Sequence, residues 1–202
     1  MIAVLDYGIG NLRSAQKALA RVGADAVLTD DASVVDGAAG VVLPGVGAFG
    51  RCMEALRESG LEEPARAAID DGRPFLGICI GMQMLYEWSE EDPGVKGMGV
   101  LPGPVRRLPD AVKRPQMQWN RLDVERPGSS LFTGLPDPAW VYFVHSYAPE
   151  PGPDVVATCD YGGPVVAAVQ RGPLWATQFH PEKSGAAGLK LLENFVRSVP
   201  RD

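Results

Sequence analysis

The sequence has little histidine, little cysteine and no long hydrophobic run. Its 202 residues include two histidines and three widely spaced cysteines, Cys52, Cys79 and Cys159. An odd number of cysteines without zinc-type spacing argues against a disulfide scaffold and against a metal site, so we predict no metal and a reducing compartment. No stretch approaches the roughly 18 apolar residues of a membrane span, so we expect no membrane association.

Basic residues are also few, and they do not cluster. Lys and Arg number 19 against 25 Asp and Glu, which gives a net charge of −6 and argues against a nucleic-acid partner. The apolar start Met1-Ile2-Ala3-Val4-Leu5 is interrupted by Asp6 and lacks a basic region before it, so we expect no signal peptide and a cytoplasmic location. A hydrophobic content of 46% supports a sizeable core, and we expect one domain over residues 1–202.

The segment 74–83 predicts a short buried strand that ends at Cys79 and turns at once into a helix. Gly77-x-Cys79-x-Gly81 has the spacing of the G-x-S-x-G nucleophile elbow, in which small flanking residues permit a strained turn with the nucleophile at its tip. A helix N-terminus after the cysteine favours the thiolate. We therefore predict that Cys79 is a nucleophile; the alternative is an inert buried thiol, the commonest state of a free cysteine.

A nucleophilic cysteine needs a base, and two histidines are available. His180 precedes Pro181, which keeps the segment out of a helix, and residues two apart in an extended segment point the same way. Glu182 is therefore placed to orient the imidazole of His180, as the acid of a triad does. His145 has no carboxylate at such a spacing, and we interpret it as structural. The sequence thus predicts a triad of Cys79, His180 and Glu182.

Two glycine-rich breaks follow predicted strands. Gly8-Ile9-Gly10 invites a dinucleotide-site interpretation, but Arg13 replaces the third glycine of that motif, so we predict no cofactor. The second break, residues 44–50, could be a simple connecting loop. Because open α/β sheets bind ligands at the carboxyl ends of their strands, we favour an oxyanion loop whose backbone N–H groups act together with that of Ile80. The residues that we assign to this oxyanion hole are Val46, Gly47 and Ile80.

The first half of the chain alternates strand, turn and helix, which predicts an α/β fold with an open, largely parallel sheet flanked by helices. After residue 94 short β-prone runs predict an antiparallel or mixed extension of the sheet. We expect strands at 2–6, 26–29, 40–43, 74–79, 100–107, 117–124, 141–144, 155–158, 165–171 and 175–179. The expected helices are 11–22, 52–59, 63–71, 186–199 and one from the Cys79 turn to about residue 88.

The cysteine turn, the glycine-rich loop and the C-terminal His-x-Glu follow one another as in class I glutamine amidotransferases, and the chain resembles that family. Within it, the sequence is most similar to glutaminase subunits of imidazole glycerol phosphate synthase, over essentially its whole length. The motifs that carry the resemblance are residues 6–14 (DYGIGNLRS), 43–50 (LPGVGAFG), 77–83 (GICIGMQ), 142–147 (YFVHSY) and 178–184 (QFHPEKS).

This resemblance implies hydrolysis of L-glutamine to L-glutamate and ammonia. The ammonia would pass to a (β/α)8-barrel synthase subunit, the partner in a heterodimer, which forms imidazole glycerol phosphate and aminoimidazole carboxamide ribotide in histidine biosynthesis. The resemblance also implies that substrate is bound by Gly47, Gln83, Glu91, Ser146 and Tyr147, with Glu91 pairing with the α-ammonium group. The residues that it places against the partner subunit are Asn11, Trp119, Tyr142 and Lys183.

The chain departs from the family pattern in one motif. The family usually has Pro-His-Met-Gly-Trp-Asn where this chain has Pro115-Gln116-Met117-Gln118-Trp119-Asn120, and the extra side chain of Gln118 bears on the contact around Trp119. Two alternative functions stay open at this point: a glutaminase that feeds another acceptor, as in anthranilate or pyridoxal phosphate synthesis, and a non-catalytic scaffolding subunit. The intact triad argues against the scaffolding subunit.

Overall fold

The computed structural model describes residues 1–200 and is built around an eight-stranded mixed sheet. Five neighbouring strands run parallel, and three more extend the sheet with antiparallel pairings. In spatial order the strands are β2 (Ala26–Thr29), β1 (Ile2–Leu5), β3 (Gly40–Gly45), β4 (Phe75–Cys79), β13 (Leu174–Thr177), β12 (Pro164–Arg171), β11 (Val155–Asp160) and β8 (Asp123–Val124).

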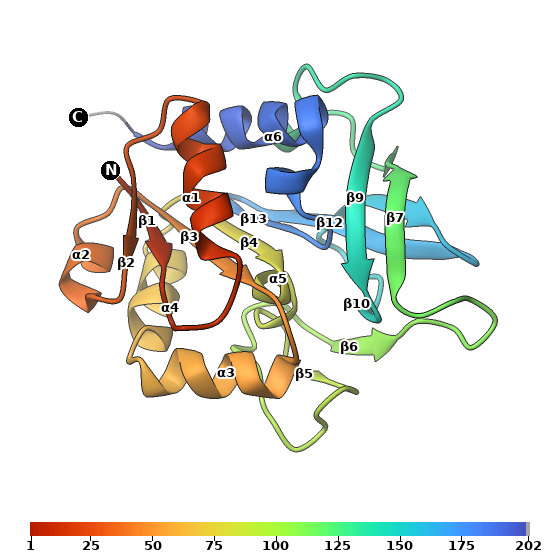
Figure 1. The fold of residues 1–202 in the computed structure, drawn as a ribbon, viewed down its shortest axis with the longest axis horizontal. Coiled ribbons are helices and arrows are strands. Elements are labelled where there is room, and N and C mark those ends of the chain that lie inside the picture. Colours follow the sequence, from red (N-terminus) through yellow and green to blue (C-terminus); the bar gives the residue numbers. More distant parts are fainter. Residues whose placement is uncertain (201–202) are drawn as a thin grey trace.

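Helices cover both faces of the parallel half of the sheet (Figure 1). Every residue of β1, β3 and β4 is buried, as expected for parallel strands packed between helices. In Figure 1, α1 (Leu12–Arg21) and α6 (Gly185–Ser198) lie above these strands, and α3 (Phe49–Glu58) and α4 (Glu62–Asp70) lie below them. The short helices α2 (Ala32–Asp36) and α5 (Ile80–Gln83) follow β2 and β4.

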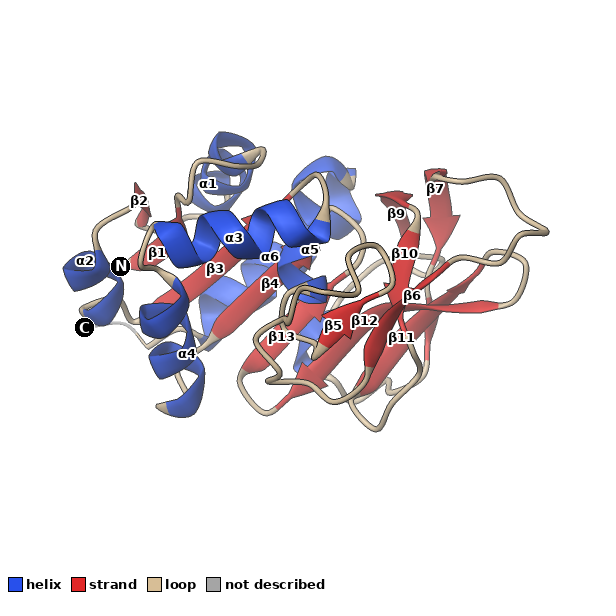
Figure 2. Cartoon of the chain, turned by 90° about the horizontal axis from the view of Figure 1, so that it is seen from below, coloured by secondary structure: helices blue, strands red, loops and turns tan. Residues whose placement is uncertain are grey.

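The other end of the molecule consists mostly of strands (Figure 2). β10 (Tyr147–Pro149), β6 (Pro104–Arg107) and β5 (Trp88–Ser89) form a three-stranded sheet, and β7 (Gln116–Arg121) pairs with β9 (Trp140–His145) in an antiparallel ribbon. Two 3-10 turns complete the described elements, η1 (Ser130–Phe132) and η2 (Pro181–Lys183). The predicted α/β fold with a largely parallel, mixed sheet is confirmed. No helix within residues 1–200 combines the length and apolarity needed to cross a membrane.

The helix predicted to run from the Cys79 turn to about residue 88 is wrong, because α5 ends at Gln83. Beyond that point the backbone carbonyls of Met84, Leu85 and Tyr86 accept hydrogen bonds from residues 98–101 instead of continuing the helix. The predicted strand 117–124 is in fact two strands, β7 and β8, which belong to different sheets. The elements α2, β5 and β10 were not predicted; each has five residues or fewer, too short for a hydrophobic period.

Candidate active site

The turn from β4 into α5 holds Cys79 in a strained backbone conformation. Its φ of 56° and ψ of −110° make it the one non-glycine residue with positive φ within residues 1–200. Such conformations persist only where the surrounding structure imposes them, and they concentrate at functional sites. The thiol is 3% exposed and lies at the carboxyl edge of the sheet, at the start of a helix. The structure therefore has the nucleophile-elbow geometry that the Gly77-x-Cys79-x-Gly81 pattern predicts.

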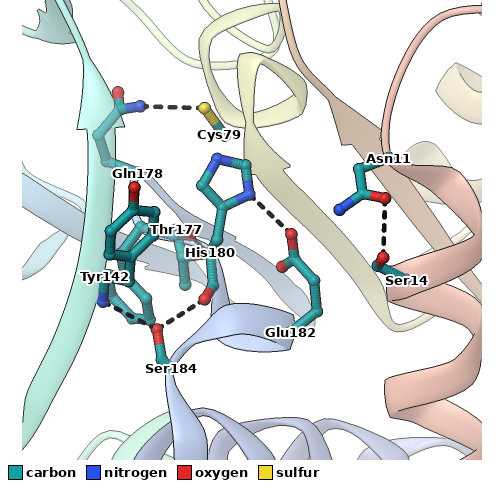
Figure 3. Close-up of polar contacts among 10 residues, drawn as sticks. Asn11, Ser14, Cys79, Tyr142, Thr177, Gln178, His180, Glu182 and Ser184 are labelled. Atoms are coloured by element: carbon teal, nitrogen blue, oxygen red, sulfur yellow. Dashed lines mark hydrogen bonds and ion pairs between the residues drawn. The ribbon is translucent and has the colours of Figure 1, made fainter. Parts of the chain in front are cut away.

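His180 follows β13 and faces Cys79 across this edge (Figure 3). Its Nδ1 lies 2.7 Å from Oε1 of Glu182, and both side chains are almost completely buried. The backbone around the ring is fixed by Ser184, whose hydroxyl donates to the carbonyl of His180 and accepts from the backbone N–H of Tyr142. The Glu182 contact places a proton on Nδ1, so Nε2 is the ring atom that faces the sulfur (Figure 3).

The charge state of His180 depends on both of its neighbours. Burial alone would lower the pKa of the imidazole, but the Cys79 thiolate and the Glu182 carboxylate raise it to about 9. Nε2 has no hydrogen-bond partner within residues 1–200, although it faces the sulfur. Loose contacts of this kind are common in active sites before substrate binds. The pair is arranged to hold a thiolate beside an imidazolium.

The glycine-rich loop after β3 lies beside the cysteine turn, because Gly45 pairs with Cys79 across the β3–β4 ladder. Tyr7 donates from its hydroxyl to the carbonyl of Pro44 at 2.7 Å, and the Cys52 thiol lies 3.5 Å from the carbonyl of Val46. These two buried side chains hold the backbone of the loop through its carbonyl groups.

A cavity of about 240 Å³ opens over Cys79 and His180. The structure brings all the predicted oxyanion and substrate residues to its wall, while Glu182 lies behind His180. The lining consists of Val46, Gly47, Cys79, Ile80, Gln83, Glu91, Pro115, Val144, His145, Ser146, Tyr147 and His180.

Two of the predicted substrate residues present hydrogen-bond acceptors. Glu91 accepts from the backbone N–H of Phe49 at 2.8 Å; burial raises the pKa of this carboxyl, that hydrogen bond opposes the rise, and nearby Asp92 adds to it. Gln83 donates from Nε2 to the carbonyl of Tyr147 and to Oε1 of Gln178, each at 3.0 Å. Its own Oε1 is buried and has no partner within residues 1–200, so it is available to a ligand.

Sequence reasoning missed one residue at this site, Gln178, and interpreted another, His145, as structural. Gln178 is fully buried, and its side-chain nitrogen lies 3.8 Å from the sulfur of Cys79. Its place two residues before His180 is the one sequence signal that could have indicated Gln178. His145 also lines the cavity, but its Nδ1 bonds the carbonyl of Tyr147 at 2.8 Å. Burial lowers the pKa of His145 to about 4, so the ring is neutral at neutral pH.

The predicted partner residues lie on the β7–β9 ribbon, just before α1 and in η2. Trp119 on β7 and Tyr142 on β9 are directly opposed, with ring centroids 6.1 Å apart. Lys183 is exposed in η2, and Asn11 lies at the start of α1 on the Glu182 side (Figure 3). Strand alternation places Gln118 on the face of β7 opposite Trp119, so its side chain does not intrude on that contact.

Comparison with known proteins agrees with this geometry. The family model for class-I glutamine amidotransferases matches residues 3–199. The imidazole glycerol phosphate synthase subunit HisH of Methanothermobacter thermautotrophicus is 50% identical over 200 residues, which cover 98% of this chain and 99% of that protein. The subunit of the same name from Rhodopirellula baltica is 50% identical over 200 residues, covering 97% of each chain.

A crystal structure of a glutamine amidotransferase matches with a TM-score of 0.75 and 24% identity, covering 96% of this chain and 98% of that one, which supports the fold. The chain belongs to the class-I glutamine amidotransferases and, within them, to the family of imidazole glycerol phosphate synthase HisH subunits.

Proposed function

We propose that this chain is the glutaminase subunit of imidazole glycerol phosphate synthase, a single glutamine amidotransferase domain that hydrolyses L-glutamine and delivers the ammonia for a step of histidine biosynthesis. The observation that carries the proposal is the strained Cys79 turn facing the buried His180–Glu182 pair. The family assignment supports the choice of acceptor, since the relatives that match over almost the full length bear that name.

In the first half of the reaction, the Cys79 thiolate adds to the carboxamide carbon of glutamine, and the C–S bond forms as the carbonyl π electrons move to oxygen. Backbone N–H groups of Val46 or Gly47 and of Ile80 stabilise that oxyanion. Removing one such donor typically raises a barrier by about 3 kcal/mol. Protonated His180 then gives its Nε2 proton to the leaving nitrogen, and ammonia departs as the C–N bond breaks. A thioester on Cys79 remains.

In the second half, neutral His180 takes a proton from water, and the resulting hydroxide adds to the thioester carbon. Glutamate leaves as the C–S bond breaks, which restores the thiolate beside the imidazolium. Throughout, Glu182 holds Nδ1 as the donor and compensates the positive charge that forms on the ring.

Substrate orientation follows from the wall of the cavity. We assign the α-ammonium group of glutamine to the carboxylate of Glu91, the half-buried acidic side chain of the lining, which already accepts from the start of α3. Oε1 of Gln83, which has no partner among the described residues, provides a second acceptor, and Gly47, Ser146 and Tyr147 provide polar groups close by. This placement directs the carboxamide toward Cys79.

We assign the partner surface to the outward face of the β7–β9 ribbon together with Asn11 and Lys183. Met117, Trp119 and Trp140 are 61%, 49% and 50% exposed, which is unusual for such large apolar side chains on adjoining strands. The proposed occupant is the (β/α)8-barrel synthase subunit, which would receive the ammonia. Tyr142 links this face to the site, because its carbonyl accepts from the backbone N–H of His180.

The decisive experiment measures glutamine hydrolysis with and without the barrel subunit and its ribotide substrate. Glutamine-dependent formation of imidazole glycerol phosphate is expected from the complex. Cys79→Ala should abolish it while leaving synthesis from ammonium salts intact, since the barrel then receives ammonia directly. Equal loss of both activities would contradict the division of labour, and hydrolysis that responds to no barrel subunit would favour a glutaminase that serves another acceptor.

A further inference from the structure

The side chain of Gln178 connects the substrate-binding wall to the nucleophile. It is fully buried between Gln83 and Cys79, with Oε1 3.0 Å from Nε2 of Gln83 and Nε2 3.8 Å from the sulfur of Cys79. Figure 3 shows its amide pointing at the sulfur from the side opposite Glu182. The hydrolysis described above assigns no role to this residue.

The hydrogen-bond network fixes which end of the Gln178 amide faces the sulfur. Gln83 directs its Nε2 at two acceptors, the carbonyl of Tyr147 and Oε1 of Gln178. A reversed Gln178 amide would place two NH₂ groups against each other in a buried site, where an unmade hydrogen bond is costly. The NH₂ group of Gln178 therefore faces Cys79 and is able to donate.

A buried thiolate requires such donors. Cys79 is only 3% exposed, so little water reaches its sulfur, and Nε2 of His180 has no hydrogen-bond partner within residues 1–200. An N–H group is the kind of polar partner that a sulfur anion accepts from, and hydrogen bonds to charged groups are stronger than those to neutral ones. Gln178 supplies this group.

A second glutamine–cysteine contact in the same molecule shows what such an amide contact does to a buried thiol. Gln116 is also fully buried, and its Nε2 lies 3.7 Å from the sulfur of Cys159. Burial nevertheless raises the pKa of the Cys159 thiol to about 11. An amide contact alone therefore does not ionise a buried thiol; at Cys79 the amide faces a sulfur that also has the ring of His180 beside it.

We propose that Gln178 is a further catalytic residue, which donates an N–H hydrogen bond to the Cys79 thiolate and is held in that orientation by Gln83. The proposal rests on the proposed function only in taking Cys79 as the nucleophile. It extends the site from a cysteine, a histidine and a glutamate to include a buried amide on the other side of the sulfur.

The test is the pH dependence of Cys79 alkylation by iodoacetamide in the full chain, with Cys79→Ser measuring any background from Cys52 and Cys159. Gln178→Met removes the donor at similar volume. The midpoint of the alkylation profile should move to higher pH, and the rate below the midpoint should fall roughly tenfold or more. Gln178→Glu, which is isosteric and still accepts from Gln83, should shift the midpoint further because it adds negative charge beside the sulfur.

Gln116→Met is the matched control, because it removes the same kind of N–H···S contact from Cys159 and should leave the Cys79 profile unchanged. Circular dichroism shows which variants are folded. If Gln178→Met is unfolded, the alkylation profile of Gln178→Glu tests the proposal instead. A folded Gln178 variant with the unaltered midpoint overturns the proposal. Alkylation needs neither glutamine nor a partner, so this result is independent of whether the chain hydrolyses glutamine.

Discussion

Gly81 packs against Leu43 so closely that a β-carbon on Gly81 would lie 1.8 Å from the carbonyl oxygen of Leu43. Leu43 belongs to β3, the strand that leads into the oxyanion loop, and Gly81 lies two residues after the nucleophile. The cysteine turn and the oxyanion loop therefore rest directly on each other through backbone atoms. This close packing is possible only because residue 81 is a glycine and has no β-carbon.

Gly81→Ala should consequently lower the free energy of unfolding. Overpacking of a core typically costs about 1–3 kcal/mol, and the loss here should be at least that large. The clash is with backbone, so neither partner can turn away, and the strand or the turn must shift. Denaturant unfolding measures the loss, and glutamine hydrolysis should fall with it as Cys79 moves. Gly128→Ala is the control, because nothing lies within 4 Å of a β-carbon there. Equal stability of the two variants would contradict the packing argument.

The residues at this turn were predictable because the constraint is local. A strand, a cysteine and a helix follow one another within ten residues, so the chain must turn sharply at the cysteine. The glycines on each side of Cys79 indicate that sharp turn. The pairing of His180 with Glu182 was also predicted, but the extended segment on which that prediction depended is wrong: Pro181–Lys183 forms the 3-10 turn η2, and the 2.7 Å contact is made across the start of that turn. The convergence of these two segments followed from the rule that parallel strands present their carboxyl ends at one edge.

Other contacts depend on tertiary structure that no local pattern encodes. Glu91 reaches the N–H of Phe49, 42 residues earlier, and Gln83 reaches Gln178, 95 residues later. The early end of α5 likewise depends on backbone bonds made by residues 98–101. From the sequence, Glu91 alone would be interpreted as part of a solvated acidic run; only the resemblance indicated otherwise.

His145 should make the stability of the folded chain fall on acidification. Its pKa is lowered from 6.5 to about 4, chiefly by burial, so the unfolded chain takes up a proton at a pH where the folded chain does not. The stability is therefore complete above pH 6.5 and is lost as the pH falls toward 4, on the order of 3 kcal/mol in all. Denaturant unfolding at a series of pH values measures this loss.

His145→Asn is the comparison variant, because its amide can still donate to the carbonyl of Tyr147 but does not titrate. It should lose less stability than the parent chain between pH 6.5 and 4, whatever its stability at neutral pH. Carboxylates contribute equally to both proteins, so the difference between the two slopes isolates His145. Parallel slopes would mean that His145 takes up its proton at the same pH in the folded and the unfolded chain.

Glu91→Gln should raise the KM for glutamine by roughly 10- to 100-fold, because a carboxylate that pairs with the α-ammonium group is replaced by a neutral amide. Binding of 4-carbamoylbutanoate, which is glutamine without that ammonium group, should change little. Steady-state kinetics and competition by this analogue measure the two effects.

Asp92→Asn is the matched control for Glu91. Asp92 accepts from the backbone N–H of Gly50 at 2.8 Å, as Glu91 does from that of Phe49, but it does not line the cavity. If both variants raise KM alike, or if the analogue loses as much affinity as glutamine, the carboxylate positions helix α3 and does not bind the ammonium group.

Trp119→Ala should weaken binding of the barrel subunit at least tenfold while leaving the stability of the isolated chain nearly unchanged. The ring is 49% exposed, so its removal opens no core cavity, yet buried aromatic side chains carry a large share of interface energy once a partner covers them. Calorimetric titration with the barrel subunit measures the affinity, and thermal unfolding measures the stability.

Val124→Ala provides the comparison, because Val124 is also an exposed apolar residue, at 38%, but lies on β8 in a different sheet. Its removal should not affect the affinity. The face around Trp119 differs because it adjoins the site: the carbonyl of Tyr142, opposite Trp119, bonds the backbone N–H of His180. A partner on this face would contact β9, the strand whose Tyr142 carbonyl bonds His180. Unchanged affinity in Trp119→Ala would place the docking surface elsewhere.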